Sequence, residues 1–311
     1  MSIAPIATAA RDLPLHRLPP LILACLAATW FIWGSTYLAI KWALISFPPF
    51  HQMGTRFLVA GALLAAWVLW RGGRWPNRAQ WINATVLGAL MLGAGYGLTA
   101  VAEQTVNSGL VVALIAIGPA LQAAFEWPYG VKPTGMEAAG IALGLVSVVG
   151  LASGQGFGAS PAGLVAVLAG SVSWKLGSVW SVRGLPRALG GRSLEMAPGA
   201  MGFASQMLAG GAVLMAVSLA LGEEPGWPPH PLALASWVYL VIAGSLVAFS
   251  AFMLLLQRTR TAVSSSYAYV NPLIGLALGV TLGGETLHWG EWLAAGLVTG
   301  SVVLMLQGRS G

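Results

Sequence analysis

The chain has 311 residues, of which 57% are hydrophobic and only 8% are charged, and its mean hydropathy is +0.78. Soluble domains carry roughly 25% charged residues, so 15 basic and 9 acidic side chains cannot supply a water-facing surface for a chain of this size. Disordered chains are charged and poor in apolar residues, which excludes disorder. The basic residues are spread along the chain rather than clustered, which argues against a nucleic-acid partner. The composition therefore predicts an integral membrane protein.

Ten segments are apolar over the length of roughly 20 residues that a spanning helix needs. In chain order they lie near residues 21–42, 50–70, 81–102, 106–126, 135–153, 160–182, 198–221, 233–256, 262–283 and 290–307. The connections between them are short, and none holds a soluble domain. Residues 1–20 form a polar tail, and the apolar run that follows is too long for a cleaved secretory signal. We expect an all-α integral membrane protein with ten transmembrane helices.

Lysines and arginines are distributed unevenly over the connections. If the N-terminus is placed in the cytoplasm, the tail, the even-numbered loops and the C-terminal end together carry twelve of the 15 basic residues, whereas the outer loops carry glutamates. Basic residues favour the cytoplasmic side of a membrane. We therefore expect a multi-pass protein of the inner or plasma membrane with both termini in the cytoplasm.

The two halves of the chain are similar at a constant spacing. Gln104 aligns with Gln257, and Pro119 aligns with Pro272, each pair 153 residues apart. The predicted organisation is thus a cytoplasmic tail followed by two five-helix repeats, residues 21–153 and residues 160–307. Because five is odd, the second repeat is inverted in the membrane. Inverted repeats are typical of secondary transporters, which bind substrate near the midplane between the repeats.

Three stretches, taken in order, resemble a known family. They are WGSTYLAIK at 33–41 with the later Arg56-Phe57-Leu58, then AEQ at 102–104 with Ser108-Gly109 and Pro119, and finally Asn271-Pro272 with Glu285. Together they resemble the EamA-domain proteins of the drug/metabolite transporter (DMT) superfamily. One turn departs from the family pattern, because Gly130-Val131-Lys132 stands where the family usually has a Gly-Glu pair. The resemblance implies a ten-helix carrier around a central cavity, often an exporter of amino acids or other small metabolites.

Arg56 lies well inside the second predicted span. A charged side chain at the centre of a membrane helix costs about 2.5–3.5 kcal/mol on insertion scales, so Arg56 needs a partner or water. Glu103 occupies the same outer half of the membrane. The two side chains could pair beside the substrate path, Arg56 could bind a substrate carboxylate, or the pair could only lock two helices together. The sequence leaves these alternatives open.

Deep aromatic and amide side chains complete the candidate site. In the family that the chain resembles, the helices that carry most of them surround the central cavity, although each one taken alone is also compatible with helix or lipid packing. The predicted cavity residues are Trp30, Trp33, Tyr37, Arg56, Tyr96, Glu103, Asn107, Trp174, Tyr267 and Asn271. Pro119 and Pro272 each free a backbone carbonyl and are predicted hinges, with a harmless kink as the alternative.

Enzyme motifs are missing from the sequence. The four histidines are scattered without a HExxH motif, and no phosphate-binding GxxxxGK[ST] loop occurs, so neither a zinc protease nor an ATPase is predicted. We expect no catalytic residue, no metal and no cofactor. If transport is coupled to protons, Glu103 or His51 is the nearest candidate, and the oligomeric state stays open.

The sequence is thus interpreted as a secondary-active transporter that exports small metabolites, amino acids first, by alternating access at a central cavity. The partners that this implies are a small-molecule substrate and the lipid bilayer. The alternatives are a carrier of drugs, organic cations, sugar phosphates or nucleotide sugars, a channel, and a membrane-embedded enzyme that acts on lipid. A dianionic phosphate calls for clustered cations, and only Arg56 and Lys175 are expected inside the membrane, since Lys41 sits at the outer end of the first predicted span.

Overall fold

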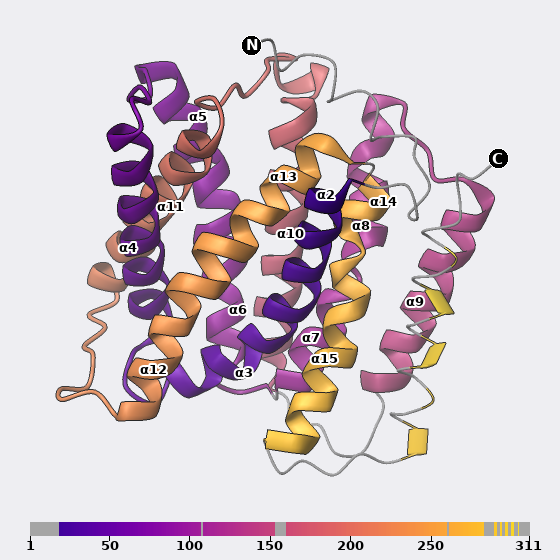
Figure 1. Cartoon of the computed structure of the whole chain (residues 1–311). Coiled ribbons are helices and arrows are strands. Elements are labelled where there is room, and N and C mark those ends of the chain that lie inside the picture. Colours follow the sequence, from indigo (N-terminus) through magenta and orange to yellow (C-terminus); the bar gives the residue numbers. More distant parts are fainter. Residues whose placement is uncertain are drawn as a thin grey trace. The chain divides into compact units, whose positions relative to one another are not determined.

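A computed structural model describes residues 19–106, 108–152, 160–259 and 261–282, together with single positions between 289 and 304. Every regular element in this part of the chain is a helix (Figure 1). The candidate Asn107, nearly all of the predicted N-terminal tail and most of the tenth predicted span lie outside the described residues. The helices confirm the predicted all-α class.

Six helices, some of them composed of consecutive segments, are long and apolar enough to cross a membrane. They are Pro20–Ala43, Pro49–Trp70, Arg78–Ala102, Pro161–Arg183, Ala200–Ala220 and Pro231–Arg258. They coincide with the first, second, third, sixth, seventh and eighth predicted spans, and they contain 21 to 28 residues each. That length suffices for a hydrocarbon core of about 30 Å. Six of the predicted spans are therefore confirmed, and the total of ten stays a prediction.

The fourth, fifth and ninth predicted spans are helical but built differently. They correspond to α7 (Ser108–Ile115) with α8 (Gly118–Glu126), to α9 (Gly135–Ala152), and to α14 (Thr261–Ser265) with α15 (Tyr267–Leu282). Pro119 lies in the first turn of α8, where its missing N–H costs no helical hydrogen bond. Pro272 lies inside α15, which continues through it.

Three of the spanning helices contain a π-helical stretch. These stretches are Ala28–Ile32 between α2 (Pro20–Ala27) and α3 (Trp33–Ala43), Ala89–Tyr96 between α5 (Arg78–Gly88) and α6 (Gly97–Ala102), and Leu240–Phe249 between α12 (Pro231–Tyr239) and α13 (Ser250–Arg258). The last two end at Tyr96 and Phe249, which are 153 residues apart, the same offset that relates Pro119 to Pro272. π-Helical geometry is rare and frequently occurs at functional sites.

The chain forms two compact units, and neither coincides with one half of the sequence. Unit 1 comprises Met1–Ser35, Ser108–Phe157 and Ala251–Gly311, whereas unit 2 comprises Thr36–Asn107 and Gly158–Ser250. Each unit therefore combines segments from both predicted repeats. Each unit has its own core.

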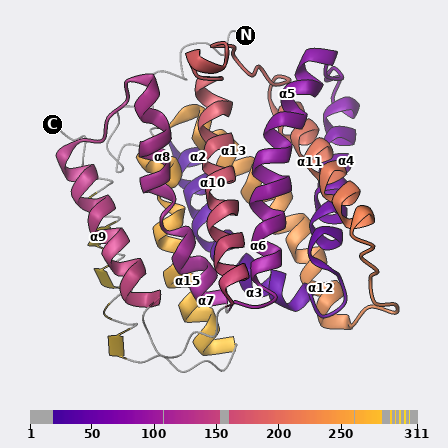
Figure 2. The same ribbon diagram turned by 180° about the vertical axis from the view of Figure 1, so that it is seen from behind.

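In unit 2, α11 (Ala200–Ala220) packs against both α4 (Pro49–Trp70) and α5 (Figures 1 and 2). Glycine lets the backbones approach closely, because a Cβ on Gly88 would lie only 2.8 Å from the backbone nitrogen of Gly210. Small residues at crossings are the usual way for membrane helices to pack. The same unit contains α10 (Pro161–Arg183), which packs against the π-helical stretch before α6.

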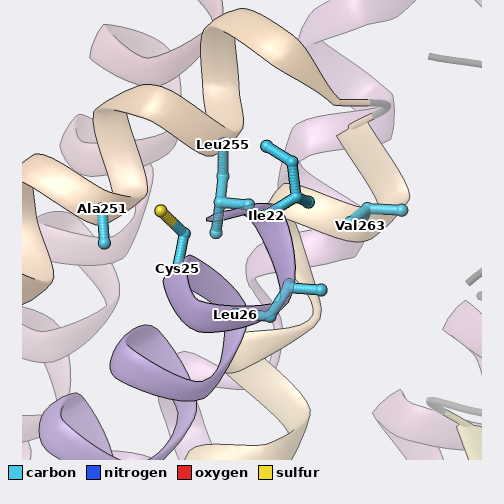
Figure 3. Packing of buried hydrophobic residues seen from close by; sticks show 6 residues of the cluster. All are labelled: Ile22, Cys25, Leu26, Ala251, Leu255 and Val263. Carbon is cyan, nitrogen blue, oxygen red and sulfur yellow. The ribbon is translucent and has the colours of Figure 1, made fainter. Parts of the chain in front are cut away.

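In unit 1, α2 packs against α13 and α14. The buried cluster at this crossing consists of Ile22, Cys25, Leu26, Ala251, Leu255 and Val263 (Figure 3). Further along, Gly34 approaches α15 so closely that a Cβ would lie 2.6 Å from the Cβ of Ile274. The first and ninth predicted spans are thus fixed against each other by close packing.

Candidate functional site

The start of α4 is capped by a carboxylate from a distant loop. The N-cap residue Pro48 makes no side-chain hydrogen bond to the helix. Instead, the carboxylate of Glu223 accepts hydrogen bonds from the backbone N–H groups of Phe50, at 3.3 Å, and His51, at 2.8 Å. A negative charge is favourable at a helix N-terminus. This cap holds the first turn of the helix that carries Arg56.

The Arg56 side chain is fully buried in unit 2. Its Nε donates a hydrogen bond to Ser245 Oγ at 2.7 Å, and Nη1 lies 3.6 Å from the sulfur of Met53. The guanidinium carbon lies 4.8 Å from the ring centroid of Phe57 and 5.0 Å from that of Tyr96. Aromatic faces attract such a cation, and more strongly when water is excluded. The charge that the sequence places in the membrane is therefore held by a hydroxyl group and two rings.

One edge of the guanidinium is left unused. Among the residues that the structure describes, Nη2 of Arg56 has no hydrogen-bond partner. Gly244 borders this nitrogen, and a Cβ at that position would lie 2.8 Å from Nη2. A buried N–H group without an acceptor costs about 1–3 kcal/mol. Arg56 thus keeps one free hydrogen-bond donor in a fully buried position.

Four aromatic rings form a closed cycle beside Arg56. Successive centroid distances are 5.2 Å from Phe57 to Tyr96, 5.3 Å from Tyr96 to Trp174, and 6.4 Å both from Trp174 to Phe249 and from Phe249 back to Phe57. Phe57 and Phe249 are fully buried, whereas Tyr96 and Trp174 keep part of their surface exposed. We call these four residues with Arg56, Gly244 and Ser245 the Arg56 site. Both predicted repeats contribute to it.

Three more of the predicted aromatic residues, Trp30, Trp33 and Tyr267, lie in unit 1. Trp33, Phe252 and Tyr267 form a triangle with centroid distances of 5.0, 5.0 and 5.4 Å. Trp30 Nε1 donates to Ser266 Oγ at 2.9 Å. The aromatic residues that the sequence predicts for one cavity are thus divided between the two units.

Asn271 also lies in unit 1 and is fully buried. With its amide nitrogen turned toward them, three backbone carbonyls lie within hydrogen-bond distance: Tyr267 O at 3.0 Å, Thr29 O at 3.2 Å and Trp30 O at 3.0 Å. Two of these carbonyls belong to the π-helical stretch of the first span. The amide therefore joins α15 to that stretch.

Other predicted site residues are placed as follows. Glu103 is the buried C-cap of α6, and it is not among the described contacts of Arg56. Tyr37 on α3 and Lys175 on α10 are buried in unit 2. In the described part of the chain, no three His, Cys, Asp or Glu side chains gather as metal ligands would.

Comparison with known proteins decides the family. The sequence model of the EamA-like transporter family matches residues 18–153 and again residues 161–307. The chain belongs to the EamA-like transporter family. The match runs through both predicted repeats and includes the segments that form the Arg56 site.

Several relatives of this EamA-like transporter are themselves named as transporters. The uncharacterized inner membrane transporter YedA of Escherichia coli (strain K12) is 39% identical over 94% of this chain and 93% of its own length. The uncharacterized transporter sll0355 of Synechocystis is 25% identical over 91% of this chain and 88% of its own. A solved crystal structure aligns with a TM-score of 0.71 at 22% identity, covering 93% of this chain and 97% of the other, which shows the shared fold. The chain is therefore a multi-pass membrane transporter for a small molecule.

Sequence reasoning missed five members or neighbours of the Arg56 site, of which Phe57 was noted only as part of the family-like stretch Arg56-Phe57-Leu58. Ser245 and Gly244 carry no sequence signal, because their importance comes only from packing against Arg56. Phe249 could have been found, since it follows Tyr96 by the repeat offset of 153 residues. Gln52 could also have been found, because it precedes Arg56 by four residues in an apolar helix and so shares its face.

Proposed function

We propose that this EamA-like transporter exports amino acids by alternating access and that Arg56 binds the substrate carboxylate. The observation that carries the proposal is the free Nη2 donor of Arg56 in a fully buried setting. A carboxylate is the natural acceptor for a guanidinium, and the charge-assisted hydrogen bond is among the stronger ones in proteins. A single cation also suits one carboxylate better than a dianionic phosphate.

The aromatic cycle supports the same substrate class. Phe57 and Tyr96 present their rings to the cation, and Trp174 and Phe249 extend this apolar surface. Small-molecule sites are mostly apolar with a few placed polar groups, and an amino acid offers both parts. Its carboxylate meets Arg56, and its side chain meets the rings.

The contact between Arg56 and Ser245 supports alternating access. Arg56 comes from the first predicted repeat, and Ser245 comes from a π-helical stretch of the second. In transporters with inverted repeats, one repeat moves against the other around the substrate site. In our proposal such a movement alters the contact between the guanidinium and Ser245 and so changes how strongly Arg56 holds the carboxylate. We also propose that both termini lie in the cytoplasm, because twelve of the 15 basic residues then lie on that side of the membrane.

Counterflow in proteoliposomes tests the proposal. Vesicles with the purified protein are loaded with pools of unlabelled amino acids, and entry of a labelled member is followed. We expect transient accumulation by the wild type and a loss of more than about 30-fold in Arg56→Ala, because removing one partner of a buried charged contact costs about 2–5 kcal/mol. Arg56→Lys keeps the charge but not the fork of donors, so it recovers only part of the flux.

The matched control is Arg74→Ala, which removes an equal charge from an exposed loop residue and leaves flux unchanged. Accumulation that survives Arg56→Ala would assign Arg56 to helix packing. Absence of counterflow with every amino-acid pool, from protein that melts cooperatively, would refute amino acids as substrates and direct the assay to organic cations and sugar phosphates.

A further inference from the structure

Gln52 is a second buried polar side chain with unmet hydrogen bonds, one turn before Arg56 on α4. Only 1% of its surface is exposed. Neither its Nε2 nor its Oε1 has a hydrogen-bond partner among the described residues. Residues four apart lie on the same face of a helix, so Gln52 and Arg56 point to one side of α4.

Buried amides are almost always paired, so an amide with both ends free needs an explanation. Its polar neighbours on the helix are already engaged elsewhere. The hydroxyl of Thr55 donates to the carbonyl of His51 at 2.8 Å and accepts from Trp237 Nε1 at 3.1 Å. The Thr55 hydroxyl also reaches the backbone carbonyl of Gln52, at 3.3 Å, but none of these groups pairs with the Gln52 side-chain amide.

A second glutamine shows what sets Gln52 apart. Gln206 in the same unit is also fully buried and its Oε1 has no partner among the described residues, but its Nε2 donates to the sulfur of Met91 at 3.2 Å. At Gln52 both ends of the amide are free among the described residues, and the next turn of the same helix face carries another free group, Nη2 of Arg56. Two unmet groups of complementary kind, one cationic donor and one neutral acceptor, point to a ligand that carries both counterparts.

We propose that Gln52 is the residue that recognises the amino group of the substrate. This inference rests on the proposed function and deepens it. Nη2 of Arg56 donates to the carboxylate, and Oε1 of Gln52 accepts from the adjacent ammonium group, so the pair binds the zwitterionic head of an α-amino acid. A neutral amide suits this role, because a carboxylate in its place would neutralise Arg56 and repel the substrate carboxylate.

The consequence is selectivity against acids that lack the amino group. A site built to hydrogen-bond a substrate N–H discriminates strongly against the analogue without it, because the buried acceptor is then left unpaired. The test compares phenylalanine with 3-phenylpropanoate and leucine with 4-methylpentanoate, as competitors in the counterflow assay. Each pair differs only by the ammonium group.

We expect the wild type to prefer the amino acid in each pair and Gln52→Leu to reduce this preference roughly tenfold. The desamino acids should compete with the Gln52→Leu variant within about twofold of their effect on the wild type, because the contact with Arg56 is intact. Gln52→Met, which is unbranched and of similar length, serves as a second variant if the leucine variant folds poorly. Gln206→Leu is the matched control, because it removes another buried amide from unit 2 and leaves the preference unchanged.

Thermal unfolding without ligand gives an independent reading. Replacing an amide that has no partner by an apolar group of similar size leaves the Tm equal or raises it, whereas replacing a paired amide lowers it. An unchanged preference in both folded variants, or a Tm lowered by several degrees in both, overturns the proposed role of Gln52. Either result leaves the proposed function standing. Failure of the wild type to exchange any amino acid overturns the proposed function and this inference together, so the two failures are distinguishable.

Discussion

The two units of this transporter each contain a set of deep aromatic side chains, but the polar groups beside the two sets differ. In unit 1 the Trp33 triangle is bordered by Trp30, which donates to Ser266, and by Asn271, whose amide faces three carbonyls. In unit 2 the aromatic cycle borders Arg56, which keeps an unused donor. An aromatic residue at membrane depth therefore does not identify a binding site by itself. The state of its polar neighbours distinguishes packing from binding.

The largest effect on stability is expected from Asn271→Leu in unit 1. The substitution leaves the carbonyls of Tyr267, Thr29 and Trp30 without the amide donor, and an unsatisfied buried acceptor costs about 1–3 kcal/mol. We expect the Tm in detergent to fall by several degrees, while the folded fraction transports normally. Asn271→Asp, which lacks the amide donor at nearly constant volume, should show the same fall. Loss of transport at an unchanged Tm would instead place Asn271 on the substrate path.

The opposite pattern is expected from Gly244→Ala in unit 2. The added Cβ would lie 2.8 Å from Nη2 of Arg56 and 3.1 Å from Cγ2 of Thr36. Because the guanidinium ends a flexible side chain, it moves aside and the fold survives. In the proposed function the displaced cation no longer meets the substrate carboxylate, and we expect counterflow to fall roughly tenfold, equivalent to about 1.4 kcal/mol.

Gly93→Ala is the control for this prediction. Gly93 lies in the π-helical stretch Ala89–Tyr96, and a Cβ there would lie at 3.3 Å from a methyl group of Val213 rather than beside a charge. We expect near-normal transport from this variant. Equal losses in the two variants would mean that the π-helical stretches tolerate no side chain, and the special position of Gly244 would be refuted.

The spans were predictable where length and hydropathy alone decide. Apolar runs such as Pro161–Arg183 are long enough to cross a membrane, and the structure builds them as continuous helices. Hydropathy does not show the π-helical stretch Leu240–Phe249, because mean hydropathy over a window depends on which residues are present and not on the type of helix they form. It also does not show that the fourth span starts again at Gly118, although Pro119 indicated a break in this region.

The candidate site was predictable only in part, for a related reason. A charge in an apolar span, such as Arg56, stands out in any sequence. Its hydroxyl partner Ser245 lies 189 positions away and is one serine among many, so only the folded chain reveals it. Asn271 is among the predicted cavity residues as a polar group in the ninth predicted span. Its carbonyl partners depend on a π-helical stretch that the sequence does not reveal.

The smallest effect is expected from Glu223→Gln, which tests how firmly α4 must be held. The variant keeps an oxygen acceptor for Phe50 and His51 but loses the charge at the helix N-terminus, which is worth about 0.3–1 kcal/mol at low ionic strength. We expect a Tm about 1–3 °C lower at low salt and a smaller difference at high salt, because salt screens charge–dipole interactions. Glu224→Gln, at the exposed neighbouring residue, should leave the Tm unchanged. Transport should change less than threefold, since Arg56 lies beyond the first turn of α4. A loss of transport as large as that of Gly244→Ala would mean that the cap, as well as the aromatic cycle, sets the position of Arg56.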